Sequence, residues 1–84
     1  MDVQSLLKQV DKQLPSGALL KGAVVKATLG ISAAELQRLA KSGDLTRVRL
    51  SPGKTGSVRY ARASVLDLVE RWAEQEMAIV EAGR

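Results

Sequence analysis

The side chains with the clearest chemical potential in this 84-residue sequence are the lysines and arginines of its middle segment. Residues 21–62 hold nine of them against only Glu35 and Asp44, a net charge of +7, whereas residues 1–20 are neutral and residues 63–84 carry −3. A basic segment beside an acidic one indicates a polyanionic partner such as a nucleic acid. The same pattern also occurs on solvated surfaces of ordinary proteins, so charge alone leaves both interpretations open.

The residue types that the chain lacks exclude several other functions. Without cysteine or histidine, the sequence offers no disulfide, no thiolate nucleophile, no imidazole metal ligand and no histidine-based triad. The nine acidic residues show no spacing typical of an acid–base pair or a metal site. We therefore predict that the protein is not an enzyme and binds no cofactor or metal. Because Tyr60 and Trp72 are the only aromatic residues, a base-stacking surface for single strands is not expected either.

The first element that must help to position the basic residues is an N-terminal helix. Apolar residues recur every three or four positions over residues 2–14, which predicts an amphipathic helix with Asp2 as its N-cap. The Pro-Ser-Gly run at 15–17 ends this helix. No apolar stretch approaches the roughly 20 residues of a membrane span, and the N-terminus is unlike a signal peptide. We therefore expect a protein of the bacterial cytoplasm or nucleoid, or of a phage-infected cell.

Residues 18–29 also have a helical pattern of apolar positions. The positions expected to face inward are Leu20, Val24, Val25 and Ala27. Gly30, directly after them, is suited to the left-handed conformation that ends a helix. The segment is therefore predicted to be a second helix that stops at Gly30.

A third helix is predicted at 33–42, one tight turn later. Ser32 is its N-cap, with Glu35 completing a capping box, and the run at 42–44 ends it. The side chains expected in the core are Leu36, Leu39 and Ala40, and those expected in solvent are Ala33, Ala34, Gln37, Arg38 and Lys41. Two helices joined by a Gly-x-Ser turn predict a helix-turn-helix, although other helical hairpins use the same turn.

A β-hairpin is predicted directly after these two helices. Residues 46–50 and 58–60 alternate with period two and are separated by turn residues. The alternation predicts an apolar face toward the helices, formed by Val48, Leu50, Val58 and Tyr60, and an opposite face formed by Arg47, Arg49 and Arg59. Lys54 and Thr55 lie at the tip between two glycines, where an ammonium group and the backbone can both approach a phosphate. A hairpin in this position is a candidate wing.

The last segment, residues 63–82, is predicted to be a long helix. Ser64 and Asp67 form a second possible capping box, and Gly83 ends the helix. An apolar stripe runs along it, with acidic residues on the other side. Its members are Val65, Val69, Trp72, Ala73, Met77 and Val80, of which Trp72 is the expected core anchor. The end of this helix is expected to extend past the core, where it can take part in self-association or bind a partner protein.

The order of these elements resembles the excisionase-like winged helix-turn-helix proteins of the MerR-like superfamily. The resemblance covers about residues 19–73 and is carried by Leu19-Leu20, Leu29-Gly30-Ile31-Ser32, Leu36, Leu39, Lys41-Ser42-Gly43-Asp44-Leu45, Val48-Arg49-Leu50, Val58-Arg59-Tyr60 and Trp72. It implies one domain over residues 1–84, mainly α with a small β-hairpin. A winged helix-turn-helix at 18–62 would be preceded by the helix at 1–14 and followed by the helix at 63–82.

The same resemblance implies that the protein binds double-stranded DNA through the third predicted helix and the wing. The implied DNA-binding residues are Ser32, Ala33, Ala34, Gln37, Arg38, Lys41, Arg47, Arg49, Lys54, Thr55, Arg59 and Arg62. The family often has polar or basic residues where this chain has Ala33 and Ala34. Alanine contacts a thymine methyl group but makes no bidentate base contact, which leaves Gln37 for adenine and Arg38 for guanine or phosphate. If five or six phosphates are neutralised, the log–log salt slope is expected to be about −4 to −5.

Several roles share these features. The family includes phage excisionases and AlpA-type transcription regulators, and the DNA-recognition domain of some phage small terminase subunits looks similar. A different class is a protein-interaction adaptor that has kept the winged fold, which the two alanines and the acidic last helix favour and the basic wing disfavours. A single small module rarely binds DNA with high specificity, so a dimer or a cooperative assembly on DNA is expected, with the N-terminal helix as the first candidate contact.

Overall fold

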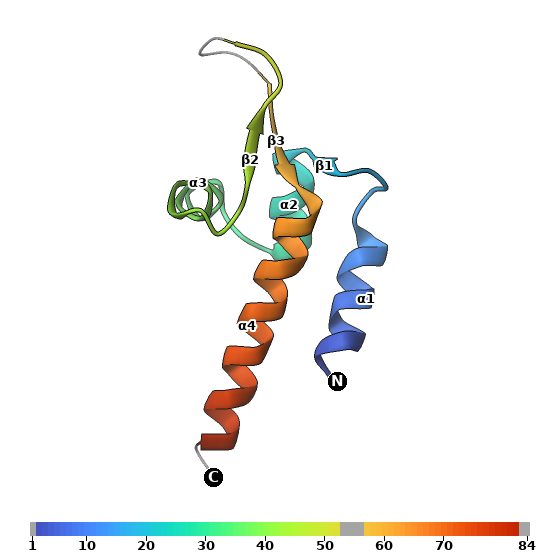
Figure 1. Ribbon diagram of the computed structural model, residues 1–84, viewed down its shortest axis with the longest axis vertical. Helices are drawn as coiled ribbons and strands as arrows, with labels where there is room; N and C mark the ends of the chain where they lie inside the picture. The colour runs from blue at the N-terminus through green and yellow to red at the C-terminus, as the bar shows by residue number, and fades with distance from the viewer. Residues whose placement is uncertain (1, 53–56, 83–84) are drawn as a thin grey trace.

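Four helices and a three-stranded antiparallel sheet make up the part of the chain that the computed structural model describes, residues 2–52 and 57–82 (Figure 1). The helices are α1 (Val3–Gln13), α2 (Gly22–Leu29), α3 (Ala33–Ser42) and α4 (Arg62–Ala82), and the strands are β1 (Leu19–Leu20), β2 (Arg47–Arg49) and β3 (Val58–Ala61). The prediction of a mainly helical chain with a small β element is confirmed, but the sheet has a third strand. The predicted hairpin tip, with Lys54 and Thr55, and the predicted helix end at Gly83 lie outside the described residues.

Helix α1 begins and ends close to where its sequence pattern predicts. The Ser5 backbone N–H donates a 2.7 Å hydrogen bond to the Asp2 carboxylate, which caps the helix and lowers the pKa of Asp2. At the other end, Leu14 leaves the helical conformation and its side chain is buried in the core. Figure 1 shows α1 lying alongside α4.

The predicted helix at 18–29 is wrong in its first four residues, which form β1 and the approach to α2. Strand β1 pairs with β3, so that Leu20 lies opposite Tyr60 and both are buried. Helix α2 begins only at Gly22, where a Cβ atom would lie 3.3 Å from both Leu36 Cδ2 and Tyr60 Cε2. The segment is a strand because Leu19 pairs with Ala61, 42 positions away in the sequence. A local helical pattern contains no information about such a distant partner. Ala27, which was predicted to face inward, is exposed.

The turn between α2 and α3 forms as predicted from its residues. Gly30 adopts the left-handed conformation (φ 67°, ψ 37°) and ends α2. Ser32 caps α3, with its Oγ accepting a 3.1 Å hydrogen bond from the Glu35 backbone N–H. In a full capping box the Glu35 carboxylate would also accept a hydrogen bond from the Ser32 backbone N–H. Here that carboxylate instead pairs with Arg38 at 2.7 Å. The burial pattern of α3 also agrees with the prediction, apart from Ala40, which is only half-buried.

The Ser32 cap gives a first testable prediction. Ser32→Ala removes the acceptor for the Glu35 N–H and is expected to lower the free energy of unfolding by about 1 kcal/mol. Ser32→Asp keeps an acceptor at the cap and should restore most of that loss. Urea unfolding followed by circular dichroism measures both variants. Equal stability of Ser32→Ala and the parent would contradict the cap seen here.

The register of the sheet corrects the predicted faces of the hairpin. In the antiparallel β2–β3 pair, Arg47 lies opposite Tyr60, Val48 opposite Arg59, and Arg49 opposite Val58. Residues directly opposite each other project to the same face of a sheet. The hairpin therefore has two mixed faces instead of one apolar and one arginine-lined face.

The outer end of strand β2 shows the consequence of this register. Val48 is only half-buried, and Leu50, which was predicted to face the helices, is 50% exposed. Alternation within a single strand predicts which of its residues share a face. It does not predict which residues of the partner strand lie on that face, because a shift of the pairing by one residue exchanges the partner's two faces.

Helix α4 begins two residues before the predicted cap at Ser64, and Asp67 is exposed. The Ser64 hydroxyl instead lies inside the first turn, donating to the Ala61 carbonyl at 2.7 Å and accepting from the Thr46 N–H at 3.0 Å. This contact joins α4 to the start of β2. Leu68, which the predicted stripe omitted, is buried.

Within the described residues, only the N-terminal half of α4 contributes buried side chains to the core. The buried apolar residues are Leu14, Leu20, Val25, Leu36, Leu39, Leu45, Tyr60, Val65, Leu68 and Val69. The prediction that Trp72 is a core anchor is wrong, since its side chain is 37% exposed. The extents of 51 × 25 × 17 Å and Figure 1 show the reason: α4 continues beyond the sheet, α2 and α3, with α1 beside it.

Candidate nucleic-acid interface

The solvent face of α3 contains the residues expected to read DNA bases. Leu36 and Leu39 are buried against the core. Residues three or four positions apart share a helix face, so the exposed residues of α3 lie together on the side opposite these leucines. These residues are Ala33, Ala34, Gln37, Arg38 and Lys41. Ser32 lies exposed at the start of the same helix, with its hydroxyl oxygen engaged as the cap.

Two of the predicted phosphate ligands lie on the same side of the sheet as α3. Tyr60 approaches Gly22 of α2, and Leu36 of α3 approaches the same glycine, so Tyr60 projects to the side of the sheet on which α2 and Leu36 lie. Arg47 lies directly opposite Tyr60 in the edge strand, and Arg49 lies opposite Val58, two residues before Tyr60 on the same face. Both arginines are exposed. The register that overturned the predicted faces therefore brings Arg47 and Arg49 to the α3 side.

The other two predicted arginines are placed elsewhere. Arg59 lies opposite Val48 and so projects from the other face of the sheet, and its guanidinium donates a 2.9 Å hydrogen bond to the Val58 carbonyl. Arg62, at the start of α4, donates to the Asp11 carbonyl at 2.7 Å and forms an ion pair with the Asp11 carboxylate. The twelve residues implied by the resemblance are thus not brought to one surface. Their roles in DNA binding stay predictions.

The acidic residues of the basic segment are both neutralised locally. Glu35 pairs with Arg38 at 2.7 Å, which raises the pKa of the Arg38 guanidinium. The Asp44 carboxylate accepts a 2.7 Å hydrogen bond from the Ser42 hydroxyl and a 3.1 Å hydrogen bond from the Arg71 guanidinium on α4. These two hydrogen bonds lower the pKa of Asp44. Lys41, Arg47 and Arg49 are further basic side chains that are exposed on the α3 side.

One of the ion pairs carried a sequence signal that was missed, and two did not. Glu35 and Arg38 are three positions apart on one helix, the spacing at which opposite charges meet. Asp44 and Arg71 are 27 positions apart, and Asp11 and Arg62 are 51 positions apart. No local pattern predicts these two, because they depend on how α4 packs.

Similarity to known proteins does not assign a function to this surface. No protein-family model, no curated protein and no solved structure matches the chain.

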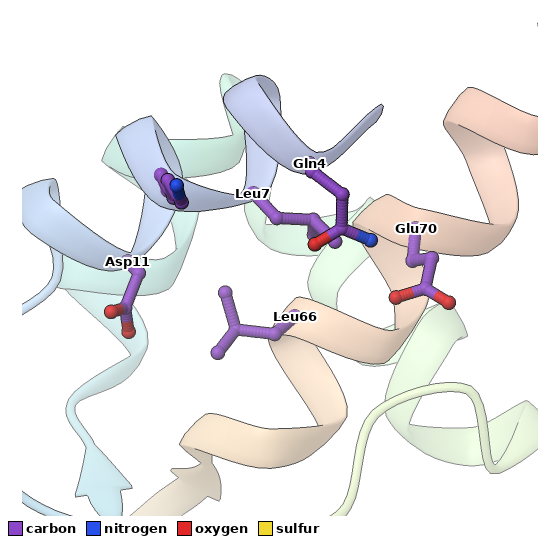
Figure 2. Close-up of a pocket in the computed structure, with 6 residues that line it drawn as sticks. Gln4, Leu7, Asp11, Leu66 and Glu70 are labelled. Carbon is purple, nitrogen blue, oxygen red and sulfur yellow. The ribbon is translucent and has the colours of Figure 1, made fainter. Parts of the chain in front are cut away.

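The groove between α1 and α4 is a further feature of the surface. One groove of about 330 Å³ lies between α1 and α4. Figure 2 shows Asp11 and Glu70 at its opposite ends, with Leu7 and Leu66 between them. Among the residues that the structure describes, no group of three or more acidic side chains is arranged to hold a metal ion. Within the same part of the chain, no helix is long and apolar enough to cross a membrane.

Proposed function

We propose that this chain is a winged helix-turn-helix protein that binds double-stranded DNA, acting in the cytoplasm as a phage-type excisionase or transcription regulator. In this proposal α2 and α3 are the helix-turn-helix, and β2 and β3 carry the wing. Recognition of phage DNA in the manner of a small terminase subunit uses the same docking and differs in the arrangement of sites and partners.

The observation that carries the proposal is that the arginines of β2 are exposed on the same side of the sheet as α3. Lys41 is exposed near the end of α3, and Arg47 and Arg49 project on the same side of the adjacent edge strand. Between them, Asp44 is engaged by Ser42 and Arg71. Exposed basic side chains next to an exposed helix match the negative phosphates that flank a major groove.

Docking then follows from the lengths of the side chains. The short residues Ala33 and Ala34 allow the first turns of α3 to approach the base edges closely, with Gln37 one turn later on the same face. Lys41, Arg47 and Arg49 contact phosphates, which fix the orientation of the helix but do not read sequence. Because a module of this size buries roughly 600–1,000 Å² on DNA, we expect a second copy to bind a neighbouring site.

Fluorescence anisotropy across a salt series tests the proposal. A labelled duplex from the DNA that flanks the protein's own gene is compared with a scrambled duplex of equal composition. Three phosphate contacts give an expected log–log slope of about −3, at about 0.9 per contact. Tighter binding of the native duplex supports a regulator, and equal binding with that slope supports architectural DNA binding. No binding to either duplex at low salt would overturn the proposal.

A second candidate, a protein-interaction adaptor with the same fold, is favoured by α4. The helix carries Met77 and Ile79, which are 46% and 65% exposed, beyond the core. Glu74 and Glu76 are exposed beside them. Such a surface fits a partner with apolar and basic side chains, and this function would survive charge reversal on the α3 side.

A further inference from the structure

The exposed face of α3 offers methyl groups and one amide to a DNA base, and little else. Ala33 and Ala34 occupy its first turn and are both exposed. The oxygen of Ser32, which precedes them, accepts the Glu35 N–H. Positions 33 and 34 of α3, which would lie deepest in a major groove, therefore carry no long polar side chain.

Arg38 is poorly placed to read guanine. Its guanidinium is bound to Glu35 at 2.7 Å, and both side chains lie on α3. An exposed ion pair of this kind is easily broken. However, an Arg38 that moved to a guanine would leave the Glu35 carboxylate without its partner close to the phosphates. This arrangement disfavours guanine and leaves Gln37 as the base-reading amide.

Gln37 and the two alanines together match an A·T pair. Gln37 lies four positions after Ala33 and three after Ala34, so the three side chains share one face. A glutamine amide pairs with N6 and N7 of adenine, and the C5-methyl group of the thymine across the pair lies in the same groove beside it. Apolar side chains are the groups that contact this methyl.

We infer that α3 selects A·T pairs by packing the Ala33 and Ala34 methyl groups against thymine C5-methyl groups. This inference rests on the proposed DNA binding and deepens it by naming the chemical group that is read. Burial of each methyl contributes about a fourfold gain in affinity, so two contacts give roughly fifteenfold.

Replacement of thymine by uracil tests the inference, because it removes the methyl and leaves the phosphates and the pairing groups unchanged. The probe is a duplex of about two helical turns, roughly 20 base pairs, containing only A·T pairs in irregular order. A second duplex carries uracil at every thymine position. The expected result is roughly fifteenfold weaker binding of the uracil duplex, with the same salt slope for both.

Variants assign the effect to α3. Ala33→Gly with Ala34→Gly should bind both duplexes equally. Ala23→Gly, at an exposed position of α2, is the matched control and should keep the preference for thymine. Because glycine weakens a helix, the Ala34→Ser variant and circular dichroism check that a lost preference is not lost folding. Ala34→Ser should reduce the preference while keeping the helix.

The other outcomes are distinguishable. Equal binding of the thymine and uracil duplexes, with a steep salt slope for each, overturns the methyl inference and leaves the proposed DNA binding intact. A thymine preference that persists in the double glycine variant overturns its assignment to α3. No binding of either duplex at low salt overturns the proposed function together with the inference.

Discussion

Reversing two charges, by Lys41→Glu and Arg47→Glu together, is expected to weaken duplex DNA binding on the order of a hundredfold at low salt, because two phosphate contacts are lost and two repulsions replace them. Lys41 is exposed near the end of α3, and Arg47 is exposed opposite Tyr60 in the edge strand β2. The log–log salt slope should become shallower by about two units. Anisotropy titrations over a salt series measure both quantities.

The matched control separates a local contact from the total charge. Lys8→Glu with Lys12→Glu on α1 changes the formal net charge from +4 to 0, as the first pair of substitutions does. Both lysines are exposed on a helix that packs beside α4, away from α3. The control should bind DNA within a fewfold of the parent. If both double variants lose affinity equally, the α3 side is not the binding surface.

The local signals in the sequence predicted the helix ends well. Asp2, Gly30 and Ser32 all act where their residue types predict, because a cap needs only the side chain and the backbone within a few positions. The exposed and buried faces of α3 were predicted for the same reason. A period of three to four residues is a property of the segment itself.

The features that depend on distant partners were not predictable in this way. Strand β1 exists because β3 pairs with it. The side of the sheet on which Arg47 projects is decided by the register of β2 on β3, which no alternation within one strand specifies. Trp72 continues an apolar stripe of α4, but the core ends one turn before it. Periodicity predicts which face is apolar and does not predict how far along the helix a neighbour covers it.

The same distinction applies to the candidate interface. The solvent-exposed side chains of α3 were predicted correctly, since they follow the period of the helix. The arginines were grouped by charge alone, and the structure separates them: Arg59 projects from the other face of the sheet, and Arg62 is bound to Asp11. The proposed docking therefore has fewer phosphate contacts than the charge count alone predicts. The salt slope, about −3 against −4 to −5, tests this difference.

The second large effect is expected from the core. Leu68→Ala truncates a side chain that is 2% exposed, at the point where α4 packs on the rest of the core. Loss of a buried leucine costs about 2–5 kcal/mol. For a domain of 60–100 residues each 1 kcal/mol lowers the melting temperature by about 4–8 °C. A fall of at least about 8 °C in the melting temperature, measured by circular dichroism, is therefore expected.

Ile79→Ala is the matched control, because it removes a similar volume from the same helix at a side chain that is 65% exposed. Its free energy of unfolding should stay within about 0.5 kcal/mol of the parent, as is usual for exposed positions. The pair of variants thus measures where burial along α4 ends. A large loss for Ile79→Ala would mean that the end of α4 is covered in solution, and a protein concentration series would then show whether a second copy covers it. Equal, small effects of both substitutions would contradict the core described here, since only packing at Leu68 distinguishes the two positions.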